Sequence, residues 1–487
     1  MQRSIALILG PLLFVLVTYL NPFEGLSEQG HAVLGTTLWV ALWWVVEAIP
    51  IAATALLPIV LFPLSGGMDL SETTASFGHK YVFLYLGGFL IAIGIEKWNL
   101  HRRIALNIIA FIGSDVRKII LGFMIATAFL SMWISNTATS VMMLPIGIAI
   151  IKQLKDNPET VEDENLIFGK ALMLGIAYSA SIGGVATLIG TPPNLVLAGI
   201  VQSIYGYEIT FLEWFRFGFP ISLILLVFCW LYLTRLAFKF KQTEFPGGKK
   251  EINRLKNKLG PISYEERWVG VVFSLAAFCW ISRSYFLQPI FPNIDDTIIA
   301  IFFGLLLFVI PSKKYPQPIL NWKDTINLPW GIILLFGGGM ALAKAFEQSG
   351  LAVWLGQLMT EFGNLSLFFL ILLLVTAINF LTEITSNLAT TAMLLPVLAP
   401  LALEVGVHPY GLMVGAAVAA SCAFMLPVAT PPNAVVFGSG YLRISDMVAK
   451  GFIMNVFSIL IISILVYFFL PIVWDIDLES FPSKFLP

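Results

Sequence analysis

The segment "ISNTATSVMMLP", residues 134–145, places hydroxyl and amide side chains in the middle of a long apolar run. Its flanks are "IILGFMIATAFLSMW" (119–133) and "IGIAII" (146–151). The pattern returns 251 residues later as "TSNLATTAMLLP" at 385–396. Polar groups are costly in apolar surroundings unless they find partners. A polar motif that occurs twice in such surroundings therefore indicates a site built from two related halves.

The composition of the chain indicates whether it folds in water or in a membrane. Hydrophobic residues make up 58% of it, charged residues 12%, and the mean hydropathy is +0.87, whereas about a quarter of a soluble domain is charged. We therefore expect a polytopic membrane protein and no nucleic-acid partner. Cys229, Cys279 and Cys422 each lie in an apolar run, which favours small core residues over disulfides. The first apolar run, 5–20, lacks a cleavage signature after it, which predicts a retained first helix.

Apolar stretches long enough for a membrane crossing, about 20 residues each, recur along the chain. Eleven candidate spans lie near 4–20, 31–48, 50–63, 80–96, 170–200, 211–238, 265–287, 296–311, 329–346, 409–440 and 450–472. Two further stretches, 119–151 and 365–403, each hold one polar motif at the middle. Each of these is either one long helix or two half-length arms that meet at a tip inside the membrane.

Positive charge favours the hairpin alternative, because Lys and Arg concentrate on cytoplasmic segments. Basic residues flank the first stretch on both sides: Lys97, Arg102, Arg103, Arg117 and Lys118 before it, and Lys152, Lys155 and Lys170 after it. Between 344 and 409 the only basic residue is Lys344. The pattern predicts two re-entrant hairpins that enter from opposite sides of a cell (inner) membrane, with a cytoplasmic amino terminus. The basic run at 239–258 is interpreted as a solvated linker between the two halves.

Three sequence pairs relate the two halves. Residues 129–145 and 380–396 share nine of seventeen positions; "IGTPPN" (189–194) matches "VATPPN" (428–433); and "LYLGGFLIAIGIEK" (84–97) is similar to "LLFGGGMALAKAFE" (334–347). The same order in both halves, starting from opposite sides, is typical of an inverted-topology repeat with a shared site near the midplane.

The chemistry of that site follows from the broken backbone. A non-helical tip persists in a membrane only inside protein or against a watery cavity. Free carbonyls with Ser, Thr and Asn oxygens suit a small hard cation, and free N–H groups at helix starts suit a carboxylate. Tandem prolines in both TPPN motifs break the next span. Glu383 is a candidate for shaping a cation site and Glu47 for holding a helix break; a structural hydrogen-bonding role is an open alternative for each.

The paired hairpin tips, the paired TPPN breaks and "WWVVEAIPIAATALLP" (43–58) resemble the divalent anion/sodium symporter family over essentially the whole chain. The resemblance implies a homodimer surrounded by membrane lipids, in which each protomer has a scaffold domain and a mobile transport domain that moves as an elevator. The implied division is scaffold helices 1–4 in 1–118, the first transport half in 119–240, a cytoplasmic linker in 241–263, scaffold helices 7–9 in 264–346 and the second transport half in 347–487.

The resemblance also implies which residues bind what. Sodium, with two or more ions per protomer, would be held by Ser131, Ser135, Asn136 and Gly190 at one site and by Thr382, Ser386, Asn387 and Ala429 at the other. Substrate carboxylates would meet Ser135, Asn136, Thr137 and Thr191 on one side and Ser386, Asn387, Leu388 and Thr430 on the other. The second tip departs from the first, because it has Leu388 where the first has Thr137. The two carboxylate subsites are therefore expected to differ.

Three functions are weighed. The first is sodium-coupled import of a C4-dicarboxylate such as succinate, malate or fumarate. The second is a sodium-independent exchanger, or a carrier of citrate, sulfate or another oxyanion, on the same fold. The third is an intramembrane enzyme, which would need an activated nucleophile. His31, His79, His101 and His408 are scattered and give no set that could activate the tip serines. The sequence therefore favours a transporter over an enzyme.

Overall fold

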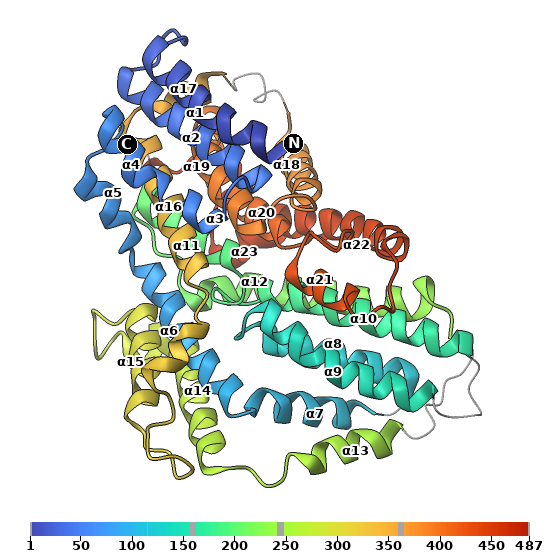
Figure 1. Ribbon diagram of the computed structural model, residues 1–487. Coiled ribbons are helices and arrows are strands. Elements are labelled where there is room, and N and C mark those ends of the chain that lie inside the picture. The colour runs from blue at the N-terminus through green and yellow to red at the C-terminus, as the bar shows by residue number, and fades with distance from the viewer. Residues whose placement is uncertain (1, 114, 156–161, 241–247, 359–364, 486–487) are drawn as a thin grey trace.

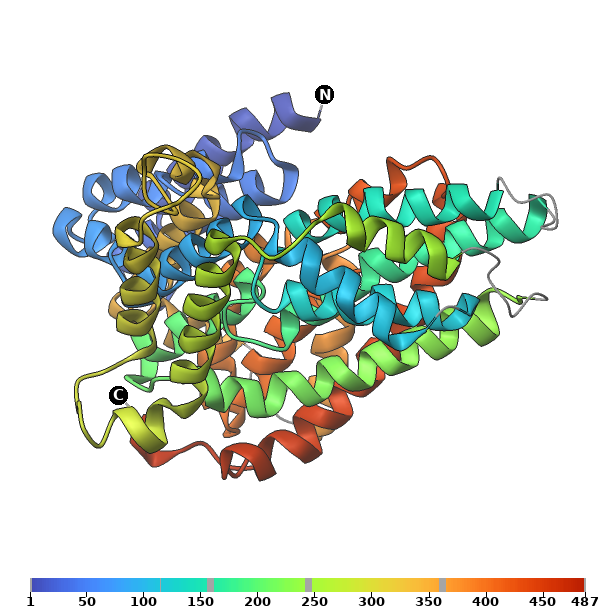
Figure 2. The ribbon, with the colours of Figure 1, turned by 90° about the horizontal axis from the view of Figure 1, so that it is seen from below.

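The computed structural model describes residues 2–113, 115–155, 162–240, 248–358 and 365–485. Within these ranges the regular secondary structure is helical, with isolated bridge residues such as the pair Pro311 and Pro318. Eight of the described helical segments are long and apolar enough to cross a membrane, and several shorter apolar helices accompany them. The predicted all-helical membrane fold is confirmed (Figures 1 and 2). The number of crossings stays a prediction.

The helices have the following bounds in chain order. They are α1 (Gln2–Leu20), α2 (Glu28–Val46), α3 (Ile51–Thr54), α4 (Leu57–Ser65), α5 (Leu70–Phe77), α6 (Lys80–Lys97), α7 (Leu100–Ile112), α8 (Val116–Ser131), α9 (Asn136–Lys155), α10 (Glu162–Val185), α11 (Pro192–Tyr205), α12 (Phe211–Leu231), α13 (Gly248–Lys258), α14 (Tyr264–Ser282), α15 (Asp296–Val309), α16 (Trp330–Gln348), α17 (Leu351–Leu358), α18 (Leu367–Leu381), α19 (Asn387–Val405), α20 (Pro409–Ala420), α21 (Pro431–Phe437), α22 (Ile444–Ile464) and α23 (Leu470–Trp474).

The amino-terminal pair α1 and α2 packs along its length. The Ser27 hydroxyl accepts the N–H of Gly30 and starts α2, as N-cap serines do. Trp43 Nε1 donates to the carbonyl of Ala6 at 2.8 Å and ties the two helices together. The predicted span 50–63 is not one helix, because α3 and α4 divide it; Pro50 precedes α3, and a second proline lies at the start of α4.

Both polar motifs lie at turns between helices. The chain leaves α8 at Ser131 and enters α9 at Asn136, and it leaves α18 at Leu381 and enters α19 at Asn387. Helices α8 and α9 contact each other and lie side by side against α10, whereas α18 and α19 both pack on α20 (Figure 1). Each stretch is therefore two arms joined at the motif and not one long helix.

The two halves exchange elements across the centre of the molecule. Helix α11, from the first half, packs against α19 and α20 of the second, and α21, from the second half, packs against α9 and α10 of the first. Each short helix after a TPPN break thus lies on the hairpin of the other half. This reciprocal packing brings the two tips to one region, as expected for a pair of related repeats.

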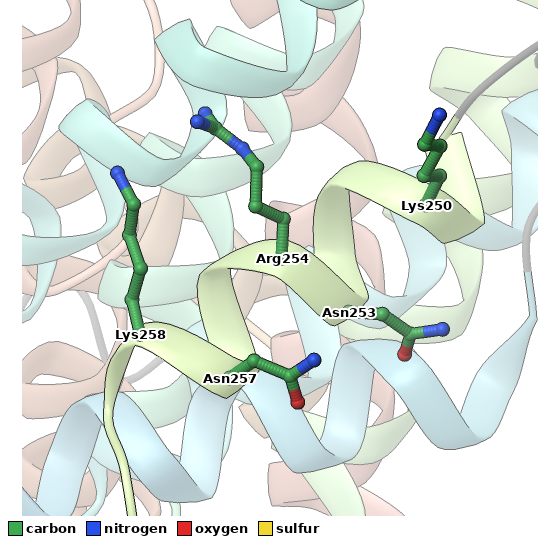
Figure 3. Close-up of a pocket in the computed structure, with 5 residues that line it drawn as sticks. All are labelled: Lys250, Asn253, Arg254, Asn257 and Lys258. Carbon is green, nitrogen blue, oxygen red and sulfur yellow. The ribbon is translucent and has the colours of Figure 1, made fainter.

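Four helices were not predicted: α5, α7, α13 and α17. They are short, and α13 is strongly polar, so a search for apolar spans passes over them. Helix α13 lies in the predicted linker and packs on α7 and α9, with Ile252 only 2% exposed. Lys250, Arg254 and Lys258 lie one turn apart on its surface (Figure 3). The linker is thus partly a docked helix; its residues 241–247 lie outside the described ranges.

Candidate functional site

Oxygen atoms converge at the first tip. Ser131, at the end of α8 and fully buried, places its hydroxyl 2.5 Å from Asn136 Oδ1 and 2.7 Å from the carbonyl of Ala180 on α10. A serine hydroxyl has one hydrogen to donate, so it cannot satisfy both acceptors. Three oxygens therefore face one another with one proton among them. Such a surplus of neutral oxygens is what a small hard cation prefers.

The second tip repeats this arrangement atom by atom. The buried hydroxyl of Thr382, which follows α18, lies 2.6 Å from Asn387 Oδ1 and 3.0 Å from the carbonyl of Ala420. Thr382 and Asn387 occupy the positions of Ser131 and Asn136 in the repeat. We refer to the two groups as the first and second oxygen clusters. Because both have the same surplus of acceptors, the geometry gives two candidate cation sites.

The end of α10 and the two breaks lie close to the tips. Gly184 faces the Asn136 amide so closely that a Cβ there would lie 2.7 Å from Asn136 Oδ1; a side chain at this position would displace the amide. Gly190 and Ala429, the predicted sodium ligands in the breaks, line the cavity that separates the tips.

Two asparagines organise the breaks, and the sequence analysis did not assign them a role. Asn194, fully buried in α11, donates from Nδ2 to the carbonyl of Thr187 at 2.8 Å. Asn433, fully buried in α21, donates to the carbonyl of Leu426 at 3.0 Å. Each amide thus adds a hydrogen bond to a carbonyl of the break that otherwise accepts a turn N–H, from Gly190 in the first half and from Ala429 in the second. The sequence does mark these asparagines, because each is the fourth residue of a TPPN motif. The prediction used only the prolines of that motif.

A cavity of about 890 Å³ lies between the two tips. All eight predicted substrate residues line it: Ser135, Asn136, Thr137 and Thr191 from the first half, and Ser386, Asn387, Leu388 and Thr430 from the second. Ser131 and Thr382 lie behind the tips and are fully buried. Since Asn136 and Asn387 belong both to the cavity wall and to the oxygen clusters, the structure brings the predicted substrate and cation residues together.

Two helix starts offer backbone hydrogen-bond donors at the cavity, beside the hydroxyl and amide side chains of its lining. Helices α9 and α19 begin at the cavity wall, at Asn136 and Asn387, and the first N–H groups of a helix have no carbonyl partner within it. Helices α11 and α21 also begin there, but each starts with two prolines that carry no N–H. The Leu388 side chain is 5% exposed and carries no donor, so the N–H is the only donor that this position has.

Charged side chains also reach the cavity, although the tip residues that line it have none. Arg3 of α1 and Glu47 after α2 are the charged residues among its described lining. Arg3 was not anticipated, because nothing in its local sequence marks it. Glu47 adopts a left-handed backbone conformation (φ 48°) and its N–H caps the carbonyl of Trp43. The predicted helix break at Glu47 is therefore present, and it is made by the backbone.

Both tips line the cavity, but the residues two positions before them, Trp133 and Ile384, have different surroundings. Trp133 stacks on Phe211 (5.9 Å between ring centroids) and on Trp280 of α14 (6.4 Å). Ile384, which occupies the position of Trp133 in the second half, is 68% exposed and lines the cavity. The cavity therefore borders the two tips unequally.

These features define an integral membrane transporter: an all-helical fold with paired hairpins, paired broken helices and a polar cavity between them. The chain belongs to the family described as the sodium:sulfate symporter transmembrane region, which it matches over residues 2–475. This family membership confirms the resemblance found in the sequence and the choice of a transporter over an enzyme.

Close relatives and solved structures agree with this assignment. The chain is 47% identical to the "sodium-dependent dicarboxylate transporter SdcS" of Staphylococcus saprophyticus, over 99% of this chain and 94% of the relative. It is 47% identical to the protein of the same name from Staphylococcus aureus, over 98% and 93%. The fold is shared with the Alcanivorax borkumensis YdaH transporter (TM-score 0.58, 14% identity, 90% and 99% covered) and with Neisseria gonorrhoeae MtrF (0.56, 13%, 82% and 83%).

The first oxygen cluster leads to a test on Ser131. We expect Ser131→Ala to reduce the stabilisation that sodium gives to the purified protein, because one of three converging oxygens is lost. A ligand that binds only the folded state raises the melting temperature with its concentration. The measurement is the melting temperature in sodium chloride against choline chloride. Ser179→Ala is the matched control, because that buried hydroxyl bonds back to the carbonyls of Gly175 and Ile176 within α10. Equal sodium shifts in wild type and Ser131→Ala would contradict the assignment.

Proposed function

We propose that this protein imports C4-dicarboxylates such as succinate, malate or fumarate, coupled to two or more sodium ions per protomer. The observation that carries the proposal is the pair of oxygen clusters beside one cavity with helix starts in its wall. The names of the staphylococcal relatives support it. A dicarboxylate fits a cavity with one donor group at each of two tips, because its carboxylates lie at opposite ends.

Coupling follows from residues that serve both ligands. Asn136 and Asn387 each turn a side-chain oxygen toward an oxygen cluster, while the helix that each begins faces the cavity. A cation that fixes the amide also fixes the first N–H groups of the helix, which a carboxylate would bind. Sodium and substrate would therefore strengthen each other's binding by the same factor, as linkage requires.

Negative charge on the substrate also calls for cations. Neither tip motif contains Lys or Arg, and helix starts supply only about half a positive charge each. Two bound sodium ions would balance a dicarboxylate near the middle of the membrane. The proposal therefore predicts transport that stops without sodium.

The first test of this function is uptake by reconstituted protein. We expect radiolabelled succinate to enter proteoliposomes in external sodium and not in choline at the same ionic strength, because empty oxygen clusters would leave both tips unfixed. Empty liposomes measure the leak. Equal uptake in the two salts would instead favour a sodium-independent exchanger, which counterflow with succinate inside the vesicles would detect.

The proposal includes an elevator movement of a transport domain against a scaffold. The transport domain would hold 119–240 and 347–487, the scaffold 1–118 and 264–346, with the linker 241–263 between them. Two such protomers would form a homodimer in the cell membrane with cytoplasmic amino termini, and the mass of the purified protein in solution tests the dimer. The unequal burial of Trp133 and Ile384 supports an alternation of the two tips.

Thiol labelling tests this movement. In a background without native cysteines, we expect Ile384→Cys to react with a membrane-impermeant reagent in one state and to become protected when sodium and succinate let the domain cross. Trp322→Cys is the control, because that loop side chain is 73% exposed and lies in the proposed scaffold. If the labelling rate at 384 is the same in choline, in sodium and in sodium with succinate, a fixed pore or a rocking bundle replaces the elevator.

The alternative substrate is citrate, sulfate or another oxyanion, and the family description itself names sulfate. Leu388 is the residue that bears on this choice. The second tip lacks the hydroxyl that Thr137 gives the first. A substrate that needs equal polar contacts at both ends would therefore lose about 1.5 to 3 kcal/mol of binding free energy at the second tip. A substrate that accepts fewer hydrogen bonds from the protein at one of its ends would be preferred.

Substitution of Leu388 tests whether this position determines which anion is preferred. We expect Leu388→Thr to change the ranking of succinate, citrate and sulfate as competitors of labelled succinate, because it restores a donor at the second tip. Leu388→Val keeps the position apolar and should leave the ranking as in wild type. An identical ranking in Leu388→Thr would show that the second tip does not contact the substrate.

A further inference from the structure

Glu383 is a buried carboxylate beside the second oxygen cluster, directly after Thr382. It is 3% exposed. Its Oε1 accepts from Asn455 Nδ2 at 2.7 Å and from two backbone N–H groups, and its Oε2 accepts from a third. The backbone donors are Phe424 at 2.8 Å, Met425 at 2.9 Å and Leu426 at 3.0 Å.

The three backbone donors are consecutive and lie in the break between α20 and α21. Helix α20 ends at Ala420, so residues 424–426 have no helical carbonyls to bind. The Glu383 carboxylate takes the place of those carbonyls. The N–H of Phe424 also donates to Asn455 Oδ1 at 3.2 Å, whereas Glu383 is the acceptor given for Met425 and Leu426. A buried N–H without a partner costs about 1 to 3 kcal/mol, so these groups would not hold this conformation without Glu383.

All four contacts of Glu383 are donors. Both of its oxygens accept hydrogen bonds, and these bonds run to the break and to Asn455, not to the Thr382 hydroxyl. The geometry of Glu383 is therefore that of a support for the break and not that of a cation ligand.

The first half organises its break without a charge. Met132 occupies the position of Glu383 in the repeat. There α10 continues to Val185, and the hydroxyl of Thr187 donates to the carbonyl of Met132 at 2.5 Å. The two oxygen clusters therefore match in their neutral oxygens and differ in their surroundings, because only the second has a carboxylate on the adjacent residue.

We propose that Glu383 is a positioning residue that makes the two cation sites unequal. It fixes the break that follows Ala420, whose carbonyl belongs to the second oxygen cluster, and so holds that carbonyl in place before a cation arrives. The second site consequently binds sodium more tightly than the first and fills first. This inference rests on the proposed sodium coupling and adds an order of binding to it.

The test is a sodium titration of the purified protein without substrate, read from the melting temperature and from intrinsic tryptophan fluorescence. Wild type should respond in two steps. Glu383→Gln keeps the size of the side chain and removes the charge, and its amide opposes one backbone N–H. We expect the tighter step to weaken roughly ten- to a hundredfold, the range for a lost hydrogen bond to a charged group, while the weaker step stays.

A matched control separates positioning from simple stability. Glu265 is also buried (3% exposed) and caps a loop, because its Oε1 accepts from the Ser312 hydroxyl and from the N–H groups of Lys313 and Lys314. Glu265→Gln should lower the melting temperature in choline but leave both sodium steps unchanged. A purely structural Glu383 would behave in the same way.

The possible results of these sodium titrations separate the inference from the proposed function. Unchanged sodium steps in Glu383→Gln overturn the inference and leave the proposed function intact. A wild type that does not respond to sodium overturns the coupling and the inference with it. If Glu383→Gln is not recovered folded, Glu383→Asp is titrated: it keeps the charge and shortens the reach, so the tighter step should weaken by less than tenfold. Equal weakening of both steps in Glu383→Asp would also overturn the inequality.

Discussion

Backbone polar groups that lack a helical partner, away from water, are the constraint on which this structure depends. Each half of the chain breaks a helix at TPPN and turns at a polar tip, and every break exposes carbonyls on one side and N–H groups on the other. Asn194 and Asn433 bind the carbonyls from their side-chain amides. Glu383 binds three N–H groups that remain in the second break. The breaks persist because side chains replace the missing helix.

These side chains do not satisfy every polar group, because acceptor oxygens without a donor remain at each tip. At each tip one hydroxyl faces two acceptor oxygens, Ser131 in the first half and Thr382 in the second, and one proton cannot serve both. A cation would complete what the protein leaves incomplete. In the proposed function, sodium binds the oxygens that lack a donor at the broken helices. The carboxylates of the substrate bind the N–H groups that lack an acceptor at the neighbouring helix starts.

The sequence predicted the tips, the breaks and the cavity residues, because polar motifs in apolar runs are conspicuous and the basic flanks of 119–151 required a turn. It did not predict Asn194 and Asn433, whose partners are backbone carbonyls that only the folded chain brings near. Arg3 reaches the cavity through the packing of α1 on α2, which local sequence does not encode. Helix α13 was taken for solvated linker because its apolar side, with Ile252, is narrow.

Symmetry in the sequence does not extend to the packing of the tips. Trp133 lies among the aromatic rings of Phe211 and Trp280, while Ile384 faces the open cavity. Two related hairpins in one protomer thus have different neighbours. Their tips nevertheless line one cavity, where Thr137 is exposed and Leu388 is buried. The proposed elevator moves both hairpins in one domain, so the likeness of the tips accounts for the shared site, and the difference in their packing would change on both sides together when that domain crosses.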